Sequence, residues 1–413
     1  MGKNEIVTGL DIGTTKICAL IGEVDEAGEI TILGCGISPS NGMKRGVVVD
    51  IEATAKAIEI AVALASKQAN VEVEAVYVGV TGEHIASLNS HVTIPITRPD
   101  REITPEDVHR VNAQSREIVL PPDRQIVHAI PRKYTVDGQD GIVKPVGMSG
   151  TRLAVETHIV HGAVTFLQNI EKCVTLAGLE VIELVLEPIA SGEAVLLPTE
   201  MTSGVCLVDI GGGTSDLAVF TEGEIYYTAV VPVGGAHVTN DVSEGLKVGY
   251  QEAERLKTES GSAVVERVTE DEVITLQQMG RDEERKLRRR ALVQIIEPRM
   301  QEMFEMILEE LDRAECLDKI PFGIVISGGG SQLRDCTEVA HSVLGLPVRI
   351  GKPHGVKGLT ETLEHPRYAT AVGLLKYAAK QKAVEQLTEQ IRKPRKVGGL
   401  QGLWAKILEM LGI

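Results

Sequence analysis

Aromatic side chains are scarce in this chain. Its 413 residues include only four Phe and one Trp, so the cores that its 43% hydrophobic content supports must be mainly aliphatic. The six cysteines are scattered and form no C-x-x-C pair, which argues against a zinc or disulfide framework and predicts reduced packing residues. The N-terminus carries no signal-peptide pattern, and no apolar run reaches transmembrane length.

Positive charge is also in deficit. The formal net charge is −16 at pH 7, which argues against nucleic acid as the main partner. The length exceeds what one hydrophobic core usually serves, so we expect two or more lobes.

The chain does contain a repeated glycine motif. Residues 9–16 (GLDIGTTK) and 207–219 (LVDIGGGTSDLAV) each deliver an aspartate, Asp11 or Asp209, from an apolar strand into a glycine turn and a second β run. Both predict strand–turn–strand hairpins. Glycine lets backbone N–H groups close around an anion. Two ordinary hairpins are the alternative, but the duplicated core favours two homologous halves closing on one polyphosphate.

A third glycine element follows the apolar strand 322–326. Three glycines precede a helical pattern that runs from Gln332 to about Val343. Unsatisfied N–H groups at a helix N-terminus suit a nucleotide contact. A plain strand–helix connection is the competitor, but it does not need three successive glycines.

Five segments follow one another along the chain in an order that is typical of a known superfamily. They are GLDIGTTK, LEPIASGEAVL (186–196), VDIGGGTSDLAV, AERLK (253–257) and VISGGGSQLRD (325–335). Together they resemble the phosphate, connecting, ribose and adenosine motifs of the actin/Hsp70/sugar-kinase ATPase superfamily. Segments 84–162, 295–300, 346–353 and 368–375 narrow the resemblance to the FtsA family of bacterial cell-division proteins, over essentially the whole chain.

The resemblance implies an α/β, actin-like ATPase fold of two duplicated lobes with an FtsA-type inserted subdomain, 1C, and a C-terminal amphipathic helix. The expected parts are the core of lobe 1 (1–83 and 163–200, completed by helix 366–380), subdomain 1C (84–162), the core of lobe 2 (201–248 and 321–365), subdomain 2B (249–320), a flexible basic linker (381–399) and the terminal helix (400–413). Within 2B, residues 281–313 are expected to be helical.

The resemblance also implies ATP and Mg²⁺ between the lobes. Asp11 and Asp209 would face Mg²⁺ through its waters, and Glu187 would orient the attacking water. Glu187 also suits a helix N-terminus, where the dipole favours an acid. The remaining expected nucleotide contacts are Gly13, Thr14, Thr15, Lys16, Gly211, Gly212, Gly213, Thr214, Glu254, Lys257, Gly328, Gly329 and Gly330. Strand alternation leaves the direction of Lys16 open.

The last fourteen residues can be interpreted without reference to any protein family. An apolar stripe at helical spacing is formed by Leu400, Leu403, Trp404, Ile407, Leu408 and Leu411. Such a helix is too short to span a bilayer but suits its interface. Arg392, Lys393, Arg395 and Lys396 lie just upstream. A helix docked on its own globule is the alternative, but the polar, glycine-ended stretch before it favours a tether and a reversible membrane anchor.

The expected function follows from these parts. FtsA resemblance implies an adaptor at the cytoplasmic face of the membrane at the division site, with at most weak ATPase activity. Its partners would be the C-terminal tail of FtsZ through 249–320, further copies of itself in filaments, anionic lipid, and later division proteins through 84–162. A type IV pilus assembly protein of the related ATPase-fold group is the alternative. A sugar kinase or chaperone is less favoured, because no substrate domain follows residue 380.

Overall fold

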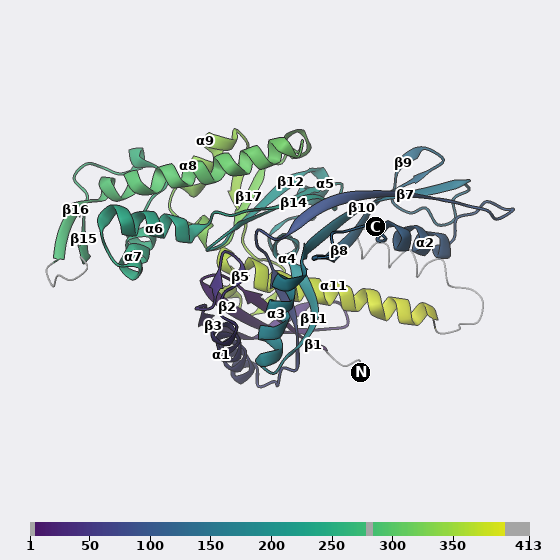
Figure 1. The fold of residues 1–413 in the computed structure, drawn as a ribbon, viewed down its shortest axis with the longest axis horizontal. Coiled ribbons are helices and arrows are strands. Elements are labelled where there is room, and N and C mark those ends of the chain that lie inside the picture. Colours follow the sequence, from purple (N-terminus) through teal and green to yellow (C-terminus); the bar gives the residue numbers. More distant parts are fainter. Residues whose placement is uncertain (1–4, 278–283, 393–413) are drawn as a thin grey trace.

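The computed structural model describes residues 5–277 and 284–392, which form an elongated molecule (Figure 1). One lobe is built on a sheet in the order β11-β6-β1-β2-β3-β19. Its strands are β1 (Glu5–Ile12), β2 (Lys16–Val24), β3 (Ile30–Pro39), β6 (Ala75–Val80), β11 (Glu180–Leu186) and β19 (Lys357–Gly358).

Helices cover both faces of this first sheet. They are α1 (Ile51–Ala69), α3 (Val164–Leu176), α4 (Glu187–Val195) and α11 (Ala369–Arg392). A Cβ on Gly36 would lie 1.8 Å from the Ala61 carbonyl of α1, and a Cβ on Gly9 would lie 2.8 Å from Leu374 Cβ of α11. Glycine in the strands therefore lets a helix approach closely on each side.

The second lobe repeats the topology of the first. Its sheet runs β14-β13-β12-β17-β18, formed by β12 (Val205–Ile210), β13 (Ser215–Thr221), β14 (Glu224–Val231), β17 (Ile324–Ser327) and β18 (Val348–Ile350). In each lobe the first strand, β1 or β12, is antiparallel to the next strand and parallel to a later one, β6 or β17. The expected actin-like fold with duplicated lobes is thus confirmed.

Helices and a small hairpin complete the second lobe. They are α5 (Pro198–Ser203), α6 (Gly235–Leu246), α7 (Tyr250–Ser260), β15 (Val273–Gln277), β16 (Glu284–Arg288), α8 (Arg289–Arg313), α9 (Cys336–Leu344) and α10 (Thr360–Leu363). The expectation that 281–313 is helical is wrong at its start, because Glu284–Arg288 pairs with β15. Cross-strand pairing of Leu287 with Ile274 outweighs the local helical preference.

Two other expected helices have different bounds. The helix expected from Gln332 begins only at Cys336, after a 3₁₀ turn at Gly330–Gln332 and after Asp335, whose φ of 62° interrupts a right-handed helix. The helix expected over 366–380 starts at Ala369 and continues to Arg392. Residues 381–392, expected in the flexible linker, are therefore helical, whereas 393–413 lie outside the described residues.

The inserted sheet has its own small core. Its order is β7-β10-β8-β9, with β7 (Ala86–Pro95), β8 (Arg124–Val136), β9 (Gln139–Ile142), β10 (Arg152–Ala163) and helix α2 (Pro105–Ser115). It lies at the end of the molecule opposite to the β15–β16 hairpin (Figure 1). A two-strand hairpin, β4 (Met43–Lys44) and β5 (Val47–Val48), precedes α1. Across residues 5–277 and 284–392, every helix is too short or too polar to cross a membrane.

Candidate nucleotide site

Two equivalent glycine turns end the first strands of the two lobes. The Gly13 N–H donates to the Lys16 carbonyl at 3.0 Å, and the Gly211 N–H donates to the Thr214 carbonyl at 2.9 Å. Asp11 and Asp209, at the same position before each turn, are both only 6% exposed. The duplication seen in the sequence therefore extends to the hydrogen bond that closes each turn.

The two turns face each other across the lobes. A Cβ on Gly212 would lie 2.5 Å from Thr15 Cγ2, and one on Gly213 would lie 2.9 Å from Thr14 Oγ1. Neither glycine has room for a side chain without a shift of its neighbour. The structure thus brings together turns that are almost two hundred residues apart in the chain.

Lys16 points toward the carboxylates. Its Nζ lies 3.0 Å from Asp11 Oδ2 and 5.6 Å from the centre of the Tyr368 ring. Burial is the largest single influence and lowers the pKa of this amine, but the charge and hydrogen bond of Asp11, together with Cys18 and Tyr368, leave the pKa raised. Lys16 is therefore a fixed positive charge at the mouth of the first turn.

Asp209 is held by two hydroxyl groups from the other lobe. Ser191 of α4 donates to Asp209 Oδ2, and Thr370 of α11 lies 3.3 Å from the same oxygen. Burial raises the pKa of Asp209 to about 6, while the bond from Ser191 opposes this rise. The sequence analysis missed both hydroxyls, although both lie in segments that it had singled out.

A third buried aspartate joins the cluster. Asp216 of β13 is 2% exposed, accepts a hydrogen bond from Thr214 at 3.2 Å and accepts another from Thr81. Burial, with the charge of Asp209, raises the pKa of Asp216 to about 7. The sequence analysis missed Asp216 too. Its signal was the second acid of DIGGGTSD, which strand alternation places on the same face as Thr214.

Glu187 is the first residue of α4 and points into the same cluster. Its Oε1 is buried and has no hydrogen-bond partner among the described residues. Burial, reinforced by the charges of Asp11, Asp216 and Asp209, raises its pKa well above the ordinary value. Glu187 therefore lies both at a helix start and among the carboxylates of the cluster, and its role in orienting water stays a prediction.

This cluster contains only oxygen donors and one amine. Within the described ranges, no three His, Cys, Asp or Glu side chains are close enough to hold a metal ion directly. The unpartnered oxygen of Glu187 marks a point where the cluster can accept a further donor or cation.

The third glycine turn lies against Asp209. Gly328 has a φ of 80°, and a Cβ there would lie 2.3 Å from Asp209 Oδ1. A Cβ on Gly330 would meet Ile210 at the same distance, whereas Gly329 is more open. The turn thus approaches the second phosphate loop closely, although no α-helix begins directly after it.

Glu254 and Lys257 lie beside this turn, on α7. Lys257 Nζ is 2.7 Å from Glu254 Oε2, 2.9 Å from Thr239 Oγ1 and 3.1 Å from the Gly235 carbonyl. A Cβ on Gly235 would be 3.8 Å from the Cα of Gly330. Glu254 and Lys257 therefore form an ion pair that reaches the edge of the glycine cluster.

The start of α6 supports the second turn from behind. The N–H groups of Gly235 and Ala236 donate to the carbonyls of Gly211 and Gly212 at 2.9 and 2.8 Å. Bonds from the helix end thus fix the carbonyl groups of the turn. The sequence analysis missed this element, whose signal was the pair Gly234-Gly235 after a strand.

Almost all of the residues predicted to bind the membrane lie outside the part of the chain that the structure describes. Arg392 is the last residue of α11. Lys393, Arg395, Lys396 and the apolar stripe of 400–413 lie outside the described residues.

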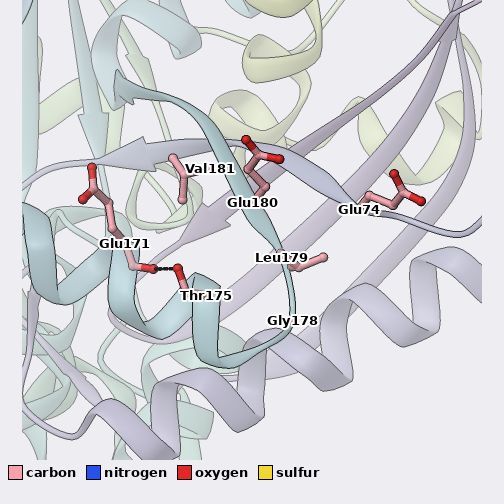
Figure 2. Close-up of a pocket in the computed structure, with 7 residues that line it drawn as sticks. All are labelled: Glu74, Glu171, Thr175, Gly178, Leu179, Glu180 and Val181. Atoms are coloured by element: carbon pink, nitrogen blue, oxygen red, sulfur yellow. Dashed lines mark hydrogen bonds between the residues drawn. The ribbon is translucent and has the colours of Figure 1, made fainter.

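A separate surface pocket of about 660 Å³ lies at the edge of the first sheet (Figure 2). Glu171 and Thr175 of α3 and Glu180 of β11 line it, with Glu74 before β6. None of the expected nucleotide residues lines this pocket.

Comparison with known proteins identifies relatives along nearly the whole chain. The family model described as "Cell division protein FtsA" matches residues 206–373, and that described as "SHS2 domain inserted in FTSA" matches 82–161. The chain is 43% identical to the cell division protein FtsA of Pseudomonas aeruginosa over 90% of this chain and 89% of that protein. It is 36% identical to FtsA of Escherichia coli K12, over 98% of this chain and 96% of that protein.

Solved structures share the fold at lower identity. The PilM-PilN type IV pilus biogenesis complex aligns with a TM-score of 0.64 at 17% identity, over 90% of this chain and 98% of that chain. MreB5 of Spiroplasma citri bound to ADP aligns with a TM-score of 0.56 at 15% identity, over 93% and 98%. These likenesses show the actin-like fold alone, so the pilus alternative gains no support from the first.

Proposed function

The chain belongs to the family of the cell division protein FtsA, and from this we propose that it is an ATP-binding adaptor that ties FtsZ to the cytoplasmic membrane. The proposal that the chain binds ATP rests chiefly on one observation. Two equivalent turns from two equivalent lobes meet at one buried carboxylate cluster. That arrangement suits a polyphosphate held between the lobes, with a cation to balance its charge.

We assign the phosphate contacts to the two turns. Backbone N–H groups within Gly13–Thr15 and Gly211–Thr214 bind the β- and γ-phosphates, apart from those of Gly13 and Gly211, which close the turns. Hydroxyls of Thr14, Thr15 and Thr214 assist. Lys16 adds positive charge beside them. Glu254 and Lys257 bind the ribose and adenine, and Gly328–Gly330 lie against the nucleoside.

Oxygen-only donors fit Mg²⁺, which keeps much of its water shell in proteins. Asp11 and Asp209 hold it through that water. When bound, Mg²⁺ supplies charge neutralisation for the phosphates. The buried, unpartnered oxygen of Glu187 supports a cation or an ordered water in this cluster.

Hydrolysis is expected to be weak. Phosphoryl transfer needs positioning as well as charge. We therefore assign ATP mainly a conformational role, in which it closes the lobes and favours filament contacts between copies of the chain.

Two surfaces are proposed for protein partners. The C-terminal tail of FtsZ binds within 249–320, and later division proteins bind 84–162. The apolar stripe of α8, including Ile296, Phe304 and Ile307, is buried in its own lobe. An FtsZ tail on α8 would therefore contact the outer polar face, where Glu305 and Glu309 are exposed.

Membrane attachment is assigned to the end of the chain. The apolar stripe of 400–413 lies in the interface of the cytoplasmic leaflet, at the division site. Each of the four nearby cations adds about 1 kcal/mol beside anionic lipid. Because the whole chain is acidic, attachment must be local to this basic segment.

Co-sedimentation with FtsZ and anionic liposomes, with and without Mg²⁺-ATP, tests the adaptor. The full chain should carry FtsZ into the liposome pellet, and ATP should increase its own assembly. Calorimetry with Mg²⁺-ATP tests the site separately, because Asp209→Asn should abolish binding there. FtsZ left in the supernatant beside pelleted chain would contradict the adaptor, and undiminished ATP affinity would contradict the site.

A further inference from the structure

Thr81 joins the nucleotide site to the inserted subdomain. It follows directly after β6, three residues before the expected start of the insertion at residue 84. Its side chain is 7% exposed, and its hydroxyl donates to Oδ1 of Asp216 in the other lobe. The residue that leads into the insertion is therefore bonded to a carboxylate of the cluster.

The first phosphate turn rests against the same point. The Gly46 N–H donates to Thr14 Oγ1 at 3.2 Å, and a Cβ on Gly46 would lie 3.0 Å from the Cα of Gly82. Gly82 has a φ of 130°, which disfavours other residues there. Both turns thus contact residues 81–82, one through Asp216 and one through the β4–β5 hairpin.

A second attachment to lobe 2 follows within the insertion. The Ser87 hydroxyl of β7 donates to the Thr228 carbonyl of β14 at 2.9 Å. His158 of β10 lies between Asn89 and Thr228. Its Nε2 is 3.1 Å from Thr228 Oγ1, and its Nδ1 is 2.8 Å from Asn89 Oδ1. The segment 81–89 is therefore fastened to lobe 2 at both ends, first at the carboxylate cluster and then at β14.

We propose that Thr81 is a positioning residue that couples the occupant of the nucleotide site to the inserted subdomain. The Thr81 hydroxyl has a single proton, so it donates either to Asp216 or to another acceptor, but not to both. Phosphate oxygens in the site would offer such an acceptor, and a cation would compete for the Asp216 carboxylate. The segment 81–89 carries the resulting change into β7. This inference rests on the proposed nucleotide site and deepens its regulation.

Hydrogen exchange of the β7 backbone amides tests the coupling in the full chain. In the wild type, Mg²⁺-ATP should slow this exchange by about fivefold relative to Mg²⁺-ADP, the low end of usual coupling between two sites. Thr81→Val and the smaller Thr81→Ala should remove most of the difference. Thr81→Ser keeps the hydroxyl and should restore it.

Thr157→Val is the matched control. Thr157 is also buried in the insertion, but its hydroxyl donates to Ser115 at 2.8 Å inside the same subdomain. Thr157→Val should lose stability yet keep the ATP-dependent difference in hydrogen exchange. If Thr81 had a merely structural role, its variants and Thr157→Val should behave alike in this exchange.

The outcomes separate the inference from the proposed function. A wild type that binds no nucleotide in calorimetry would overturn both. Nucleotide binding with an unchanged exchange difference in Thr81→Val or Thr81→Ala would overturn the coupling alone. Failure of Thr81→Ser to restore the difference would also overturn it.

Discussion

Lys16 Nζ lies 3.0 Å from Asp11 Oδ2, across the first hairpin of the chain. The pair places a permanent positive charge beside the turn that we assign to phosphate, in surroundings where burial strengthens electrostatic interactions. The same lysine lies over the ring of Tyr368, which the C-terminal part of the chain supplies. One side chain therefore links the first hairpin to the turn that directly precedes α11.

Replacing Lys16 should weaken nucleotide binding. We expect Lys16→Met to lower the affinity for Mg²⁺-ATP by about tenfold or more in calorimetry, because a hydrogen bond to a charged group is lost. Lys56→Met is the control, since Lys56 pairs with Glu59 on the surface of α1. An equal loss of ATP affinity in both variants would mean that Lys16 contributes only to the net charge of the protein and makes no specific contact.

Gly328→Ala should lower the affinity for ATP in addition to destabilising the folded chain. Gly138 also has a positive φ, 88°, but a Cβ there would meet nothing within 4 Å. Gly138→Ala should lose about 1 kcal/mol of stability in urea unfolding, because L residues disfavour this backbone conformation. Gly328→Ala should lose more, because its Cβ would also lie 2.4 Å from the Ile210 carbonyl oxygen. Only Gly328→Ala crowds Asp209, so only it should also lose ATP affinity. Normal affinity in that variant would remove the third turn from the site.

Stability should depend on pH through the buried aspartates. The pKa values of Asp209 and Asp216 rise from the ordinary 3.8 to about 6 and about 7 in the folded chain. The folded state then holds protons more tightly than the unfolded state between about pH 4 and pH 7. The free energy of unfolding from these groups is therefore highest near pH 4 and falls as the pH rises to 7.

For the two aspartates together, the expected size of this change between pH 4 and pH 7 is about 6 kcal/mol, at 1.36 kcal/mol per pKa unit. Urea unfolding at several pH values measures it in the nucleotide-free chain. Asp216→Asn should flatten the decline, because an amide does not titrate. Identical slopes for wild type and variant would contradict the raised pKa of Asp216.

Removing the terminal stripe should release the chain from membranes. Trp404→Glu, or deletion of 400–413, should abolish pelleting with anionic liposomes while ATP binding persists, because the apolar area that enters the interface is lost. Trp404→Phe keeps an apolar ring and should still pellet. Continued pelleting of the deletion variant would show that another surface binds lipid.

Much of the fold was predictable from local pattern. The two hairpins form where Asp-Ile-Gly motifs interrupt apolar β runs. Errors arose where tertiary pairing outweighs local preference. The charged stretch Glu284–Arg288 is a strand because β15 pairs with it, and α11 continues beyond the residues assigned to it.

The sequence predicted the glycine turns and most of the charged residues near them, but not Asp216, although that acid lies in the second motif. Ser191, Thr370 and Thr81 have no motif that marks them as partners of Asp209 or Asp216. Each lies in another part of the chain, from 18 to 161 residues away. Pairing at such separation is set by the packing of the lobes, which no local pattern encodes.

The amino-acid sequence alone determined the duplicated turns, because glycine and aspartate spacing dictates backbone conformation within a few residues. It also determined the apolar stripe at the end of the chain, which is a matter of periodicity. Only the tertiary structure decided that Lys16 points to Asp11, that Asp216 belongs to the cluster and that Thr81 ties it to the inserted subdomain. Those relationships depend on how the strands and lobes pack and on burial, which raises the pKa values of the carboxyl groups and favours hydrogen bonds from the buried hydroxyls of Ser191, Thr370 and Thr81.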